Sequence, residues 1–81
     1  MKDFKKDLIG KLPQLKKHAM ILSKKHLENT ENDEEDLFQE TVKKALLKQD
    51  EFNGEYLLAW LKTMMRNIAI DEFRHESKKI E

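Results

Sequence analysis

The 81-residue chain has no cysteine, one proline and only two glycines. Without cysteine it has no disulfide and no thiolate metal ligand, which fits a reducing compartment. So few turn-forming residues favour helices over a β-sandwich or barrel. We therefore expect an all-α protein, a compact bundle of three to four helices forming one domain over residues 1–81.

Long apolar runs are also missing. The first residues, MKDFKKDLIGKLP, contain no stretch suited to a signal peptide, and no later segment approaches the length of a membrane span. We expect a cytoplasmic protein with no membrane partner.

The chain has no net charge, because 16 Lys and Arg balance 16 Asp and Glu. The charges are segregated, however: residues 1–30 carry +5, residues 31–55 carry −6 and residues 56–81 carry +1. A neutral domain is not expected to bind duplex DNA strongly alone. Its acidic middle suits a basic protein surface.

Motifs for catalysis and metal binding are lacking. His18, His26 and His75 have no partner at HExxH spacing, and the acidic residues 33–36 lack the alternating ligands and central glycine of a calcium loop. No glycine-rich phosphate loop is present. We predict no enzyme activity, no catalytic residue, no cofactor and no metal site.

Hydrophobic spacing predicts four helical segments, over residues 3–12, 13–26, 33–49 and 55–78. Pro13 is expected to end the first segment or to kink its join to the second. Asn53-Gly54 predicts a turn before the last segment.

The third segment begins with a strong helix signal. Asn32 or Asp33 can cap it, and acidic residues in its first turn suit the helix dipole. The spacing predicts a buried stripe and, beside it, a separate row. The stripe is Phe38, Val42, Ala45, Leu46 and Gln49; the row is Asp36, Glu40, Lys43 and Leu47.

The fourth segment has a predicted core stripe and a polar flank. Ile70 and Phe73 fall off the stripe, which suggests that the first helix buries a second side. The stripe is Leu57, Leu61, Met64, Met65 and Ile68; the flank is Trp60, Thr63, Asn67, Arg74 and Lys78, with Asp71 at its edge.

Two stretches, DLFQET and AWLKTMMRNIAIDEFR, stand out, although periodicity alone is satisfied by simple amphipathic helices. Taken in order over roughly residues 8–78, the motifs resemble region two of bacterial sigma factors of the extracytoplasmic-function (ECF) type. The matching residues are Asp36 to Thr41, Phe52, Ala59-Trp60-Leu61, Arg66-Asn67, and Asp71 with Arg74.

That resemblance implies a polymerase-binding surface on the third segment. In the family this helix docks on the clamp helices of the largest subunits of RNA polymerase core. Acceptors beside an apolar anchor suit a basic, partly apolar partner; the alternative is a solvated helix start. The implied contacts are Asp36, Leu37, Gln39, Glu40 and Lys43.

The resemblance also implies that the loop and fourth segment melt and read promoter DNA, on the non-template strand of the minus-ten element. Tyr56 or Trp60 could stack on an unpaired base, Asn67 could bond a base edge, and the cations would neutralise phosphates. Two alternatives stay open: Trp60 as a core residue, and Asp71 as an ion-pair partner of Arg74 or His75. The implied DNA-binding residues are Asn53, Gly54, Tyr56, Trp60, Lys62, Arg66, Asn67, Asp71, Arg74 and Lys78.

The expected function is thus promoter recognition in transcription initiation by an alternative sigma factor, with an anti-sigma factor as a further implied partner. The chain stops where the family's linker and region 4 domain would begin, and Glu72 and Glu76 make its last helix less basic than usual. These departures favour an alternative: a helical interaction module that binds polymerase or a regulator without reading DNA.

Overall fold

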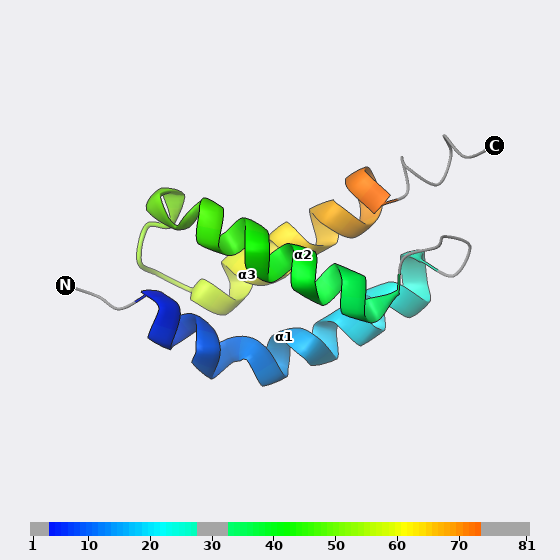
Figure 1. The fold of residues 1–81 in the computed structure, drawn as a ribbon, viewed down its shortest axis with the longest axis horizontal. Helices are drawn as coiled ribbons and strands as arrows, with labels where there is room; N and C mark the ends of the chain where they lie inside the picture. Colours follow the sequence, from blue (N-terminus) through cyan, green and yellow to red (C-terminus); the bar gives the residue numbers. More distant parts are fainter. Residues whose placement is uncertain (1–3, 28–32, 74–81) are drawn as a thin grey trace.

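The computed structural model describes residues 4–27 and 33–73 of the chain. It contains α1 (Phe4–His26), α2 (Glu34–Leu47), a 3₁₀ turn (Gln49–Glu51), α3 (Leu57–Asn67) and a π-helical continuation (Ile68–Phe73). In Figure 1, α1 runs along one side of the pair formed by α2 and α3. The predicted all-α bundle is confirmed.

The first two predicted segments form one helix, so the alternative in which Pro13 ends the first segment was wrong. Proline removes the hydrogen bond to the carbonyl of Ile9 and disfavours a helix interior. Pro13 and Ile9 are both exposed, so water can reach that carbonyl, while Leu8 and Leu15 on either side of the proline are buried. Burial on both sides of Pro13 holds the helix together, and its ribbon curves around the other two helices (Figure 1).

The predicted start of the third segment is confirmed at Asp33. The backbone N–H of Asp36 donates to Asp33 Oδ1 at 3.0 Å, and the N–H of Asp33 donates to Asp36 Oδ2 at 3.1 Å. This reciprocal capping box satisfies two backbone donors at the helix start. The α-helix ends at Leu47, earlier than predicted, because Gln49 already belongs to the 3₁₀ turn.

The buried face of α2 is rotated from the predicted stripe. Leu37, Thr41 and Ala45 are fully buried, whereas Phe38 and Val42 are only half-buried. The predicted stripe did not include Thr41. Its hydroxyl donates to the carbonyl of Leu37 at 2.7 Å, so it enters the core without an unpaired donor.

A single hydrophobic core joins the helices, and in the described residues no buried side-chain nitrogen or oxygen lacks a hydrogen-bond partner. The predicted core stripe of the last segment is confirmed at four positions, and Met64 is half-buried. The buried apolar residues are Leu8, Leu15, Ala19, Leu22, Leu27, Leu37, Ala45, Leu57, Leu61, Met65, Ile68 and Ala69.

The last helix is less uniform than predicted. It begins at Leu57 and changes from α-helical to π-helical winding at Ile68; its predicted end at residue 78 lies outside the described residues. The π-helical segment packs against both α1 and α2, and Ile70 is half-buried; the side chain of Phe73, the other residue of the predicted second side, lies outside what the structure describes. Rare π-helical turns occur frequently at functional sites.

Within the described ranges, no helix combines the length and apolar character needed to cross a bilayer. The same residues contain no cluster of three or more His, Asp and Glu side chains placed to hold a metal ion.

Candidate functional site

The outer surface of α2 is open to a partner. Asp36, Gln39 and Lys43 are exposed, and Glu40 is half-buried. Gln39 Nε2 donates to Glu35 Oε2 at 3.0 Å, so its amide is oriented along the helix surface. Four of the five residues predicted to bind polymerase therefore lie on accessible surface.

Leu37 does not belong to that surface. Its side chain is 0% exposed and lies in the core, so no partner can contact it in this conformation. Leu47, on the same helical row as Asp36, Glu40 and Lys43, is 76% exposed. The predicted row already contained Leu47, and its exposed position makes it the apolar residue that a partner can reach. We call Asp36, Gln39, Glu40, Lys43 and Leu47 the α2 outer row.

Asp36 has a structural role besides its place on this row. Its carboxylate accepts the backbone N–H of Asp33 in the capping box. Removing it would weaken the helix start as well as change the surface. Loss of binding on substitution of Asp36 would therefore not identify a contact.

The loop before α3 holds three of the predicted DNA-binding residues in a defined geometry. Asn53 Oδ1 accepts the backbone N–H of Glu55 at 3.0 Å, and Gly54 has φ 93°. Tyr56 adopts left-handed backbone angles, φ 57° and ψ 54°, with its side chain 81% exposed. A bulky residue in this region is strained. The loop thus presents an exposed aromatic ring on a constrained backbone.

Three aromatic rings fix this loop to the bundle. The Phe52 ring lies 5.1 Å from that of Trp60 and 5.9 Å from that of Phe4, between centroids, and Phe4 lies 6.0 Å from Trp60. These separations suit attractive edge and tilted ring contacts. Trp60 therefore packs against the core, as one alternative held.

Trp60 also lines a pocket between α2 and α3. Asn67 lines the same pocket, and both residues belong to the polar flank that was predicted for the last helix. The pocket has a volume of about 250 Å³. Two cationic side chains, Lys44 and Lys48, also line this pocket, and the sequence analysis did not predict them as site residues. Their i, i+4 spacing, which places both on one face of α2, could have indicated them. We call this the α2–α3 pocket; its lining is Lys44, Lys48, Trp60, Thr63, Met64, Asn67, Ile68 and Glu72.

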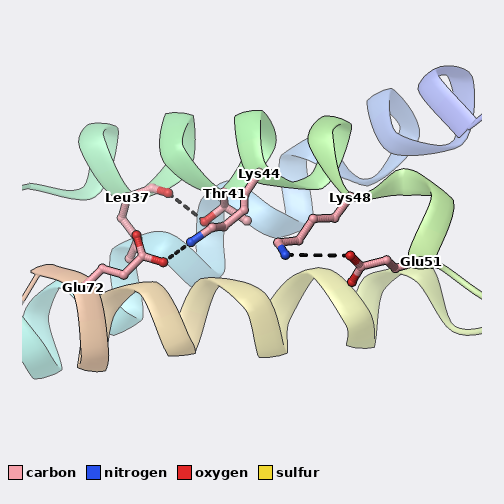
Figure 2. Close-up of polar contacts among 6 residues, drawn as sticks. All are labelled: Leu37, Thr41, Lys44, Lys48, Glu51 and Glu72. Atoms are coloured by element: carbon pink, nitrogen blue, oxygen red, sulfur yellow. Dashed lines mark hydrogen bonds and ion pairs between the residues drawn. The ribbon is translucent and has the colours of Figure 1, made fainter.

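Figure 2 shows how these lysines are held. Lys44 reaches from α2 to form an ion pair with Glu72 on the π-helical segment. Lys48 Nζ lies 3.8 Å from Glu51 Oε2 beside the 3₁₀ turn. Exposed pairs of this kind contribute little stability. The two ion pairs instead hold the ammonium groups of Lys44 and Lys48 in place beside the pocket.

The remaining predicted DNA-binding residues are not gathered at this pocket. Lys62 faces α1: burial lowers the pKa of His18 below its ordinary value, and the Lys62 charge adds to that shift. Arg66 and Asp71 are exposed, and neither lines the α2–α3 pocket. Arg74 and Lys78, and the suggested pairing of Asp71 with Arg74 or His75, lie outside the described residues.

Residues 11–79 match the sigma-70 region 2 family, and the chain belongs to that family. Over 76 residues it is 33% identical to the ECF RNA polymerase sigma factor EcfG of Rhodopseudomonas palustris (strain TIE-1), covering 93% of this chain and 39% of that relative. The chain thus spans about two fifths of that relative's length. No solved structure matches it. The resemblance to an ECF sigma factor region two is confirmed.

Proposed function

We propose that this chain is the promoter-recognition domain of an alternative sigma factor. In this role it binds RNA polymerase core, and within the holoenzyme it helps to open and hold the minus-ten element during transcription initiation. The observation that carries the proposal is the family match over residues 11–79, which includes every candidate binding residue. The domain acts by binding and performs no covalent chemistry.

The α2 outer row is the proposed docking surface for the polymerase clamp helices. It combines acceptors, at Asp36, Gln39 and Glu40, with a cation at Lys43 and the exposed Leu47 side chain. Such a mixture suits a partner that carries basic groups beside apolar ones. Leu37 serves this surface indirectly, because its burial fixes the rotation of α2.

The loop and the α2–α3 pocket are the proposed sites for separate unpaired bases of the non-template strand, because Tyr56 and Asn67 lie at opposite ends of α3. Separating a duplex costs on average about 1.4 kcal/mol per base-pair step, so an extruded base must be held by new contacts. Tyr56 offers an exposed ring for stacking, and Asn67 offers both a donor and an acceptor to a base edge. Lys44 and Lys48 line the same pocket, and because Glu72 in the same lining pairs with Lys44, the lining carries a net charge of +1.

Docking is tested with Gln39→Ala and Glu40→Ala combined in the full chain, measured by pull-down with a clamp-helix fragment of the polymerase. We expect binding to weaken while the circular dichroism spectrum stays unchanged, because neither side chain belongs to the core or the capping box. Asp50→Ala is the charge-matched control, since Asp50 is exposed on the 3₁₀ turn. Equal capture of the double variant and the control would contradict docking through this row.

Base reading is tested with Asn67→Ala, measured by fluorescence anisotropy on single strands that differ in the minus-ten sequence, with polymerase core present. We expect the differences in affinity between strands to shrink. Gln14→Ala, which truncates an exposed amide on α1, is the control and should preserve them. If the unmodified protein bound all strands equally, the domain would be an interaction module that reads no bases.

A further inference from the structure

The positive charge of α1 is not used by the proposed function. Between Phe4 and His26 the helix carries seven lysines and one acidic residue, Asp7. Lys16 already lies over the Phe38 ring, 5.8 Å from its centroid. Lys6 and Lys11 instead line a second pocket, at the end of α1 that contacts the loop.

This second pocket, the α1–loop pocket, has a volume of about 510 Å³ and lies between α1 and the loop that precedes α3. Glycines contribute to both walls: Gly10 from α1 and Gly54 from the loop. A Cβ placed on Gly10 would meet nothing within 4 Å, so the α1 wall of the pocket has free space at this position. The lining is Lys6, Asp7, Gly10, Lys11, Phe52, Gly54 and Leu57.

We propose that the α1–loop pocket binds the phosphodiester backbone of the single strand whose bases the loop and the α2–α3 pocket hold. The inference rests on the proposed function and deepens it, because it adds a backbone site to the base site. Two ammonium groups suit a phosphate, whose contacts position a strand without reading its sequence. Asp7, in the same pocket, opposes that charge and limits the affinity.

The connection between the two sites is the loop itself. Phe52 lines the α1–loop pocket and contacts Trp60, which lines the α2–α3 pocket. A strand that places a base against Tyr56 or Asn67 therefore has a positively charged surface beside the same loop for its neighbouring phosphates. This geometry predicts that α1 contributes affinity and salt dependence, while α3 contributes sequence preference.

The test uses the full chain and fluorescein-labelled oligo(dT), a single strand with no promoter sequence, titrated at several salt concentrations with and without polymerase core. Lys11→Gln should weaken binding several-fold at low salt and reduce the slope of log K against log salt by about 0.7, the value for one lost phosphate contact on a single strand. Asp7→Asn should have the opposite effect and tighten binding. Lys24→Gln, at the far end of the same helix, should leave the slope unchanged.

The outcomes separate this inference from the proposed function. If Lys11→Gln and Asp7→Asn leave affinity and slope unchanged while Asn67→Ala still alters sequence preference, the phosphate site is wrong and promoter reading stands. The inference also fails if the unmodified chain does not bind oligo(dT) at low salt. Weaker capture of polymerase by Lys11→Gln in the absence of DNA would assign this surface to a protein partner and overturn the inference.

Discussion

The helices α1 and α2 pack against each other, but they differ in what makes each of them helical. In α2 the signals are local: a capping box, acidic residues in the first turn, Lys44 in the last turn, and no glycine or proline. In α1 the local signals oppose a continuous helix, because Gly10 and Pro13 lie inside it. Burial of side chains on both sides of these positions keeps α1 continuous through them.

This difference separates two kinds of substitution. Changes on the outside of α2 should alter binding to a partner while the helix persists, because its local signals remain. Changes on the inside of either helix should alter folding, because an 81-residue domain has a small core and a stability of only about 5–15 kcal/mol.

The largest expected effect contrasts two leucines of α2. Leu37→Ala should lower the free energy of unfolding by about 2–5 kcal/mol, because it leaves a cavity in the core. Leu47→Ala, at a 76% exposed position, should change stability by about 0.5 kcal/mol or less and weaken capture by the clamp-helix fragment. Urea denaturation and the pull-down measure the two effects; equal stability losses would contradict the assigned rotation of α2.

The capping box provides the next test of local specification in α2. Asp33→Ala should lower stability by about 1 kcal/mol, because the backbone N–H of Asp36 loses its acceptor. Asp33→Asn keeps an acceptor and should retain most of the stability. Chemical denaturation of the two variants distinguishes them, and an alanine variant as stable as the unmodified protein would show that the cap contributes nothing.

In α1, by contrast, one substitution is expected to raise the stability of the protein. Gly10→Ala should raise stability by about 0.5–1 kcal/mol, because alanine restricts the unfolded chain and its methyl group meets nothing within 4 Å. Thermal unfolding by circular dichroism measures the change. A lower midpoint would mean that α1 depends on conformational freedom at this position.

The smallest expected effect is a pH dependence from α1. Burial, and then the Lys62 charge, lower the pKa of His18, so the folded state favours the neutral imidazole. Its stabilising contribution is present above the unfolded pKa of about 6.5 and is lost as the pH falls below that value towards the folded pKa. Denaturation midpoints measured between neutral and acidic pH should fall less steeply for His18→Gln. Identical profiles would show that His18 is not the responsible group.

Residue patterns correctly predicted the structural features that depend on residues close together along the chain. The cap at Asp33 and the core stripe of α3 follow from local spacing, and both are present. The continuity of α1 through Pro13 and the burial of Thr41 were missed. The first depends on tertiary burial; the second depends on a hydroxyl that bonds within its own helix.

Candidate site residues divide in the same way. The ordered motifs located the α2 outer row and the loop, but they placed the buried Leu37 on the surface and gave no sign that Tyr56 is left-handed. The α2–α3 pocket needed the fold, because its Lys44–Glu72 pair joins residues far apart in the sequence. The change to π-helical winding after Asn67 was likewise not predictable, because the spacing analysis assumes a regular α-helix.

Because α1 is continuous, one curved helix runs along the length of the bundle. Phe4 near its first end touches Phe52 before the loop, and its last end lies beside the start of α2 (Figure 1). A helix broken at Pro13 would act as a hinge between these ends. The unbroken helix has no hinge of this kind, so one element joins the aromatic contacts beside the loop to the start of α2.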